Sequence, residues 1–399
     1  MKRRVAIVVQ RCHEKLVGGA EAHAWQYATL LADAYDVDVL TSTALDYIRW
    51  DNDLPAGVER RDGVTIRRFR VERGRTSYFS RLHRRVLDRF EATAGAPDED
   101  RYGWPEALEE EFIRSQGPVC PALYEHLRTH GEDYAAVIFL TYLYPTTFDG
   151  VRAMPHRRFG LVPTLHDEPP AYLRVIGQMA RGIPRILWNT QAERRLGGRL
   201  WNRDSGNLVA MTVATDAAAP AREGFPYLLY CGRIDVNKGC DHLLAWFAAY
   251  KAARPDSPLR LLMTGHNIMQ VADDANVSVL GFVEEERKFA LMAGAVAFVQ
   301  PSPYESLSIV ALEAMAQGTP NIVNGRSEIL ADHVEQSGAG FVYHDQAAFD
   351  AALDAATALD ADARASQGDR ARRYVLDHYS LDQVRARLIA EVEALASAS

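Results

Sequence analysis

The stretch ESLSIVALEAMAQGTP, residues 305–320, holds an apolar run with helical spacing and ends in a Gly-x-Pro stop. It places Glu305 and Glu313 eight positions apart, and Glu313 lies among Ala, Leu, Ile, Val and Met. A carboxylate is costly to bury in such surroundings unless a polar group meets it. We therefore predict a helix here and expect a polar group to contact Glu313.

Short apolar runs alternate with longer amphipathic runs on both sides of this stretch. This alternation is typical of β-α-β units and a parallel sheet. Strands are predicted at 4–9, 36–40, 65–69, 135–140, 159–166, 185–190 and 208–214, and then at 227–233, 260–266, 277–283, 296–302, 321–325 and 340–344.

The segment 216–226, DAAAPAREGFP, separates these two series of strands. It is rich in Ala and Pro and poor in large apolar residues, so we interpret it as a linker. The arrangement predicts an α/β fold with two doubly wound, Rossmann-like domains facing a central cleft. Ligands of such sheets bind at the carboxyl ends of the strands.

The bulk composition is that of a soluble globular protein, with 48% hydrophobic and 25% charged residues in a chain of 399. The net charge of −8 argues against a nucleic acid partner. Four scattered cysteines without a C-x-x-C pair argue against a zinc site or disulfides and fit a reducing cytoplasm. No stretch approaches the roughly 20 apolar residues of a membrane span, so we expect a cytoplasmic protein.

Two further segments stand outside the repeating pattern. Residues 90–130 interrupt the first domain, with a helix predicted at 105–114 and another starting at Pro121. Near the end of the chain, steps of three and four predict a helix with one apolar face. That face comprises Leu381, Val384, Leu388, Val392 and Leu395.

Two short motifs bring glycines or cations to the ends of predicted strands. In GGAE, Gly18 and Gly19 let the backbone approach a ligand, and the following helix start favours an anion. A plain tight turn explains the same residues. In CGRIDVNKG, residues 231–239, Arg233 suits a diphosphate through a forked contact and Lys238 as a point charge. Two solvated surface charges are the alternative interpretation.

The motif PTLHDEP, residues 163–169, brings His166, Asp167 and Glu168 to another strand end. Charged residues rarely gather at a buried strand end without a functional reason, although a structural histidine is the alternative. No second His or Cys lies at ligand spacing, so we predict no metal site there.

The segment PSPYESLSIVALEAMAQGTP, residues 301–320, combines a loop with a helix start. Ser306 or Ser308 is expected to cap the helix, whose first N–H groups and positive dipole end would face a phosphate. Glu313 would lie about 8 to 12 Å further along. The alternative is an ordinary buried helix with one awkward Glu.

The basic segment 67–90 is dense in Arg with interleaved Phe and Tyr. A solvated helix face explains it, and an anionic acceptor or a membrane surface is the other reading. Peripheral contact with the inner membrane face therefore stays open.

Taken in this order, the motifs resemble the family 4 (group 1) retaining glycosyltransferases with the GT-B fold. The resemblance runs through GGAE, His-Asp-Glu at 166–168, Gly-Arg with a following Lys-Gly at 232–239, Thr-Gly at 264–265, and the paired glutamates with their EAMAQGTP tail. It implies an N-terminal acceptor-side domain at 1–217, a C-terminal nucleotide-sugar-binding domain at 218–374, and a helix at 375–399 that crosses back to the first domain.

The resemblance also implies how a diphosphate would be held. Arg233 and Lys238 would neutralise it as it leaves, as two of the catalytic residues. N–H groups around Ser306, Leu307 and Ser308 would add hydrogen bonds.

The remaining roles concern the sugars and the base. Glu313 would bind the ribose hydroxyls, catalytic Glu305 the donor sugar's hydroxyls, and catalytic His166 would lie near the reacting carbon. Gly18 and Gly19 would keep the wall beside the phosphates flat. Further donor-side residues are Gly265, Phe282 and Val283, with the last two near the base. Tyr142, Tyr144 and Glu168 are predicted to line the acceptor side.

The implied activity is transfer of a sugar from a nucleotide diphosphate sugar, UDP- or GDP-linked, to a glycan, lipid-linked or small-molecule acceptor in cell-surface polysaccharide biosynthesis. No cofactor is expected. Because no Asp-x-Asp metal motif occurs at the predicted donor site, we expect metal-independent activity. A nucleotide-sugar epimerase of the same fold and a non-catalytic nucleotide-sugar-binding protein remain alternatives. The inserted segment 90–130 and the sequence VATD at 213–216 depart from the family pattern.

Overall fold

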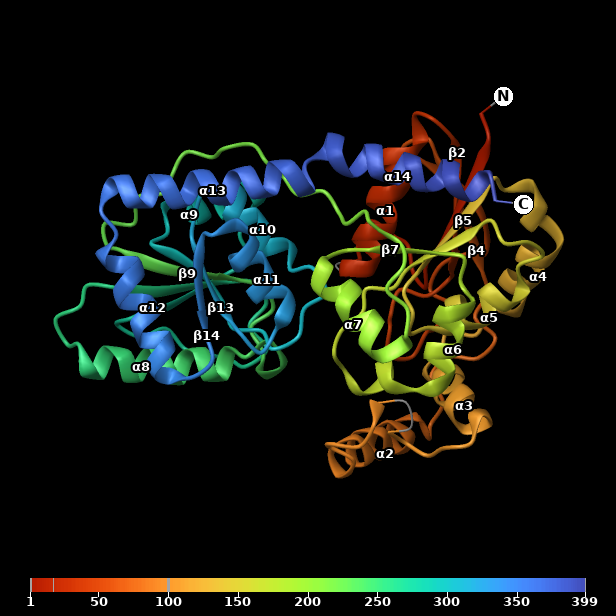
Figure 1. The fold of residues 1–399 in the computed structure, drawn as a ribbon, viewed down its shortest axis with the longest axis horizontal. Coiled ribbons are helices and arrows are strands. Elements are labelled where there is room, and N and C mark those ends of the chain that lie inside the picture. The colour runs from red at the N-terminus through yellow and green to blue at the C-terminus, as the bar shows by residue number, and fades with distance from the viewer. Residues whose placement is uncertain (1, 17, 99–100, 399) are drawn as a thin grey trace. The chain divides into compact units, whose positions relative to one another are not determined.

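The computed structural model describes residues 2–16, 18–98 and 101–398. The chain forms two compact units (Figure 1): an N-terminal unit of Met1–Met211 with Val384–Ser399, and a C-terminal unit of Thr212–Gln383. The sequence-based boundaries at 217 and 374 stay predictions.

The N-terminal unit is built on an eight-stranded sheet in the order β3-β4-β2-β1-β5-β6-β7-β8. All neighbouring strands are parallel except the hairpin of β3 and β4. The strands are β1 (Arg4–Val8), β2 (Asp36–Ser42), β3 (Gly57–Arg61), β4 (Val64–Phe69), β5 (Ala136–Leu140), β6 (Phe159–Val162), β7 (Arg185–Trp188) and β8 (Asn207–Leu208).

Helices connect these strands. They are α1 (Gly19–Ala32), α2 (Phe79–Ala92), α3 (Glu106–Gln116), α4 (Pro121–His130), η2 (Gly131–Asp133), α5 (Pro145–Ala153), η3 (Pro169–Tyr172), α6 (Arg174–Gly182) and α7 (Gln191–Trp201). The helix predicted at 105–114 is therefore α3, and α4 begins at Pro121 as expected.

The C-terminal unit has a six-stranded parallel sheet in the order β11-β10-β9-β12-β13-β14. Its strands are β9 (Tyr227–Cys231), β10 (Arg260–Thr264), β11 (Val277–Gly281), β12 (Ala297–Gln300), β13 (Asn321–Asn324) and β14 (Gly340–Tyr343). Its helices are η4 (Val236–Lys238), α8 (Cys240–Ala253), α9 (Glu285–Gly294), α10 (Ile309–Ala316), α11 (Glu328–Ser337), α12 (Gln346–Ala358) and α13 (Ala361–Tyr379).

The core of the N-terminal unit lies on both faces of its sheet, because successive side chains of a strand point to opposite faces. On β1, Ala6 and Val8 join one buried apolar cluster, whereas Val5 and Ile7 join the other. The last helix, α14 (Leu381–Ala396), completes the second cluster and packs against α1 (Figure 1). Of its predicted apolar face, four residues are fully buried and Leu381 is exposed.

Two sequence predictions need correction, and one strand was missed. The strand expected at 159–166 ends at Val162, and a loop follows. The strand expected at 208–214 is only the two residues of β8, although the apolar residues after it are buried. Strand β3 was missed because its residues, GVERR, are mostly exposed and polar.

Within the described residues, no helix combines the length and the apolar character that a bilayer-spanning segment needs. Helix α2 carries the basic part of segment 67–90, and Arg81, Arg84, Arg85 and Arg89 are exposed on it. This agrees with the solvated-face interpretation.

Candidate functional site

The C-terminal sheet reverses its strand order between β9 and β12, which are neighbours at its centre. In open α/β sheets, ligands bind outside the carboxyl ends of the strands at such a reversal. Arg233 follows β9 by two residues, and Glu305 lies in the loop that follows β12. The topology therefore gathers the predicted diphosphate and sugar residues at one edge.

Lys238 contacts Glu305 directly: its Nζ donates to Oε1 at 2.8 Å. Asp235 accepts the backbone N–H of Lys238 at 3.0 Å and forms an ion pair with Arg233. Gly239 adopts φ +72°, and a Cβ there would lie 2.5 Å from the carbonyl oxygen of Pro301. The cation segment and the Glu305 loop thus pack together through a contact that only glycine allows.

The start of α10 is fixed by two buried side chains that the sequence analysis missed. Ser308 is the residue before the helix and has φ 59°, in the left-handed region. Its hydroxyl makes no cap bond; it instead accepts from Gln300 Nε2 at 3.1 Å. A ring nitrogen of His333 lies 2.8 Å from the carbonyl oxygen of Leu307. The expectation that Ser306 or Ser308 caps the helix through its side chain was therefore wrong.

Glu313 does meet a polar group, as expected: Lys288 Nζ donates to both carboxylate oxygens at 2.9 Å. Burial raises the pKa of Glu313, and the positive charge of Lys288 opposes the shift. Lys288 lies on α9, twenty-five positions earlier in the chain, and no local sequence motif predicted its contact with Glu313. A ligand hydroxyl would therefore meet a carboxylate that is already oriented by its ion pair with Lys288.

Gly265 lies at the carboxyl end of β10 and contacts the backbone at the carboxyl ends of β9 and β11. It has φ +123°, a Cβ there would lie 2.0 Å from the carbonyl oxygen of Gly232, and its N–H donates to Gly281. Next to Gly281, Phe282 is 84% exposed, and Val283 is part-buried. An exposed aromatic ring at a strand end is available to a flat ligand group.

In the N-terminal unit, the GGAE motif is organised around its own glutamate. A Cβ on Gly18 would lie 2.2 Å from Glu21 Oε2, whereas Gly19 has open space around it. The buried Glu21 carboxylate is held by Arg11 at 2.6 Å and by Gln10 at 3.1 Å. The start of α1, which was expected to favour an anion, therefore already carries the carboxylate of Glu21 in its first turn.

The loop after β6 carries His166, Asp167 and Glu168. Tyr142, which is 1% exposed, donates to Glu168 Oε1 at 2.7 Å. Tyr142 is therefore buried and orients the carboxylate of Glu168. For the second predicted tyrosine, Tyr144, burial and then the charge of Glu21 raise the pKa to about 12.

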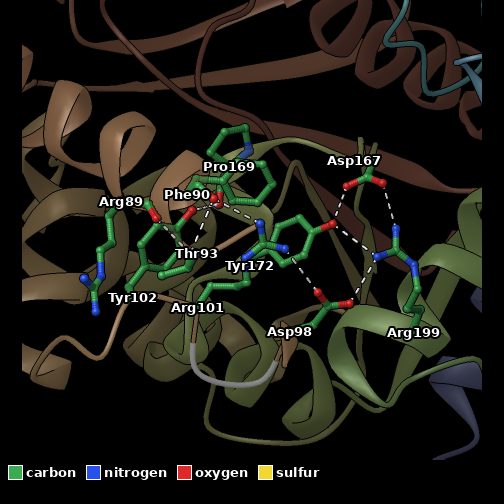
Figure 2. Close-up of polar contacts among 10 residues, drawn as sticks. All are labelled: Arg89, Phe90, Thr93, Asp98, Arg101, Tyr102, Asp167, Pro169, Tyr172 and Arg199. Atoms are coloured by element: carbon green, nitrogen blue, oxygen red, sulfur yellow. Dashed lines mark hydrogen bonds and ion pairs between the residues drawn. The ribbon is translucent and has the colours of Figure 1, made fainter. Parts of the chain in front are cut away.

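Figure 2 shows how the inserted segment holds this loop. Asp167 accepts from Tyr172 at 2.6 Å and from Arg199 at 2.7 Å, and Arg199 also contacts Asp98. Tyr102 donates to the carbonyl oxygen of Pro169 at 2.5 Å. The insertion therefore contributes to the shape of the His166 loop.

Residues 225–358 match the family model described as Glycosyl transferases group 1. This part of the chain is a group 1 glycosyltransferase domain. Over these residues the group 1 family that the motifs indicated is confirmed, and the matched residues include the whole cluster from Arg233 to Glu313.

Curated relatives match over similarly limited stretches of the chain. Mannosylfructose-phosphate synthase of Agrobacterium fabrum is 27% identical over 165 residues, 34% of this chain and 36% of the relative. The GDP-mannose-dependent alpha-(1-6)-phosphatidylinositol dimannoside mannosyltransferase of Mycobacterium tuberculosis is 30% identical over 118 residues, 28% of this chain and 30% of the relative. The chain thus spans about a third of the length of these relatives.

Solved structures are similar over the full length of the chain. Sucrose-phosphate synthase from Thermosynechococcus elongatus has a TM-score of 0.69 at 18% identity, covering 100% of both chains. A structure titled trehalose-6-phosphate from E. coli bound with UDP-2-fluoro glucose has a TM-score of 0.68 at 12% identity, covering 99% of both chains. At these identities the likeness concerns the fold, and it confirms GT-B.

Proposed function

We propose that this chain is a metal-independent, retaining glycosyltransferase that moves a hexosyl group from a nucleotide diphosphate sugar to an acceptor. The observation that carries the proposal is the contact of Lys238 Nζ with Glu305 Oε1 at 2.8 Å. It joins the cation suited to a diphosphate with the carboxylate suited to sugar hydroxyls, at the carboxyl edge where the strand order reverses.

The chemistry follows from the charges that develop as the sugar–phosphate bond breaks. Negative charge grows on the diphosphate, and in this proposal Arg233, Lys238 and the N–H groups at the start of α10 would stabilise it. These cations are now paired with Asp235 and Glu305, so a diphosphate would exchange one anionic partner for another. Positive charge at these residues also removes the need for a metal ion at the leaving group.

The new glycosidic bond would form on the face that the phosphate leaves. The bond from the anomeric carbon to the phosphate oxygen breaks, the bond to the acceptor oxygen forms, and the acceptor's proton passes to the phosphate. In this proposal Glu305 binds donor-sugar hydroxyls, Glu313 the ribose, and His166 lies near the reacting carbon.

The relatives' names support a UDP- or GDP-linked donor. One relative is named as GDP-mannose-dependent, and one similar structure is titled as bound to UDP-2-fluoro glucose. Their names also include sugar phosphates and a phosphatidylinositol mannoside, so we propose a glycan, lipid-linked or small-molecule acceptor in a cytoplasmic, surface-polysaccharide pathway.

The experiment is thermal unfolding with UDP, GDP, ADP and dTDP at millimolar concentration, each with and without EDTA. A ligand of the folded state raises the melting temperature by mass action. We expect one nucleotide to do so, insensitively to EDTA. No shift with any nucleotide would overturn the donor-site proposal, and conversion of the donor sugar without an acceptor would favour an epimerase.

A further inference from the structure

The loop that presents His166 begins with a strained turn. Thr164, two residues before it, has φ 52°, a left-handed conformation that is a genuine outlier for a β-branched residue. Such strain persists only where the surrounding structure holds it, and it gathers at functional sites. Some group must therefore hold the backbone at this point.

That group is the carboxylate of Glu193, on the first turn of α7. Its side chain is fully buried, Oε1 accepts the N–H of Leu165 at 2.6 Å, and Oε2 accepts the N–H of Asn189 at 2.5 Å. Thr190, the N-cap of α7, accepts the N–H of Glu193 at 3.0 Å. Leu165 is the residue between the strained Thr164 and His166.

This arrangement goes beyond an ordinary helix cap. In a capping box the glutamate turns back to the N-cap's own N–H, and the motif serves its helix alone. Here one carboxylate ties the end of β7 to the loop after β6. Burial raises the pKa of Glu193 to about 8, with the N–H groups of Asn189 and Leu165 opposing the shift. Within the described residues no cation pairs with this carboxyl group, so its hydrogen bonds alone offset the cost of burying it.

The neighbouring side chains of the loop have partners of their own, as Figure 2 shows for Asp167, and Tyr142 holds Glu168. In the described part of the chain, the imidazole of His166 has no hydrogen-bond partner. Its direction therefore depends on the backbone turn that precedes it.

We propose that Glu193 is a positioning residue that, by binding the N–H of Leu165, fixes the strained turn that aims His166. The inference rests on the proposed function for its catalytic meaning, because His166 is a proposed catalytic residue.

The first test compares Glu193→Gln with Glu391→Gln. Glu391 is a second buried carboxylate of the same unit, 3% exposed and bound to Arg185. Glutamine at 193 would turn an NH2 toward one of the two backbone N–H donors and leave it unsatisfied. Both variants should melt earlier, but only Glu193→Gln should shift the imidazole NMR signals of His166 and speed amide exchange at Leu165 by about tenfold or more.

Turnover gives a second readout, measured as release of nucleoside diphosphate from the donor. We expect Glu193→Gln to lower kcat by about tenfold to a hundredfold, because a small misplacement of a catalytic group is that costly. The donor KM should stay nearly unchanged. Unchanged His166 signals and Leu165 exchange in folded Glu193→Gln would overturn the inference.

Glu193→Asp keeps the test decisive if Glu193→Gln does not fold. Aspartate is shorter by one methylene and cannot bind the N–H groups of Leu165 and Asn189 together, so the same His166 signals should broaden or shift. Signals identical to those of the wild type would overturn the inference. His166→Asn separates the two proposals: wild-type turnover there removes the catalytic role of His166 but leaves the NMR result on the loop standing.

Discussion

The donor-side cluster of the C-terminal unit and the His166 loop of the N-terminal unit use their polar groups in opposite ways. In the cluster, cations remain accessible: Arg233 is 47% and Lys238 33% exposed, each paired with one carboxylate. In the loop, the supporting groups are buried and bound to backbone or to one another: Glu193 is fully buried and Tyr142 is 1% exposed.

The difference teaches what each region does before a ligand arrives. Accessible ion pairs in water contribute little to folding, so their charges can be given to a ligand at little cost. Buried, satisfied polar groups contribute to a single geometry and are costly to disturb. The donor-side cluster can therefore exchange its ion pairs for contacts with a ligand, whereas the His166 loop keeps one geometry. Substitutions in the two regions should affect turnover and stability differently.

The largest effect should come from Lys238→Ala. Removing one group that stabilises developing charge typically costs about 10² to 10³ in kcat. Stability should change by about 1 kcal/mol or less, because the pair with Glu305 is partly exposed. Turnover and thermal melts of the same preparation check both numbers.

Lys251→Ala is the matched control for that variant. Lys251 lies on α8 of the same unit and donates to the backbone of Ser257. It should keep wild-type turnover. Equal turnover of folded Lys238→Ala and the wild type would remove the diphosphate role and, with it, the contrast between the two regions.

The next effect is the pH dependence that Glu193 gives to stability. Its folded-state pKa of about 8 lies above the ordinary value of 4.5, so folding takes up a proton between these values. Its contribution is therefore fully present below pH 4.5 and is lost as the pH rises toward 8, at about 1.4 kcal/mol per pH unit. Urea unfolding at pH 5.5, 6.5 and 7.5 should show this slope in the wild type relative to Glu193→Gln. Parallel curves for the two proteins would contradict the assignment.

A smaller effect, on nucleotide binding, is expected at Glu313. Here the exchange of an ion pair for a ligand in the donor-side cluster can be tested with two nucleotides that differ only in their ribose hydroxyls. A hydrogen bond to a charged group contributes about 1.5 to 3 kcal/mol, so Glu313→Gln should weaken nucleotide binding by about tenfold or more. The loss should largely vanish for the matching 2′,3′-dideoxynucleotide, which lacks the hydroxyls. Calorimetry with both nucleotides checks this.

Lys288→Met is the control at that site, because it breaks the same ion pair and keeps the carboxylate. It should bind the ribonucleotide more tightly than Glu313→Gln does. An equal loss for the ribonucleotide and the dideoxynucleotide would contradict ribose recognition.

The sequence predicted well those features that repeat or that lie close together in the chain. Parallel strands buried on both faces are continuous apolar runs, so β1, β5, β9 and β12 were readable. The exposed edge strand β3 has no such run and was missed. The residues after β8 have such a run and several are buried, but the strand itself ends at Leu208.

The candidate sites divide in the same way. Lys238 and Glu305 were expected together because each belongs to a local motif at a strand end. Lys288, Gln300 and Glu193 could not be found, because the contacts that give them their roles are made with residues that the fold brings near. Their roles follow from tertiary packing and not from their spacing in the sequence.

The smallest effect tests whether the donor-side cluster also contains a rigid part, at Ser308. This residue combines a left-handed φ of 59° with a hydrogen bond from Gln300. Both Ser308→Gly and Ser308→Ala lose the bond and leave Gln300 Nε2 without its acceptor, but only the glycine variant also removes the backbone strain. We expect the alanine variant to be less stable than the glycine variant by about 1 kcal/mol. Denaturant unfolding of the two variants checks the order, and the reverse order would mean that the backbone at the start of α10 is not left-handed in solution. If the expected order holds, the helix start that would receive a phosphate is preorganised like the His166 loop, while the cations around it remain exchangeable.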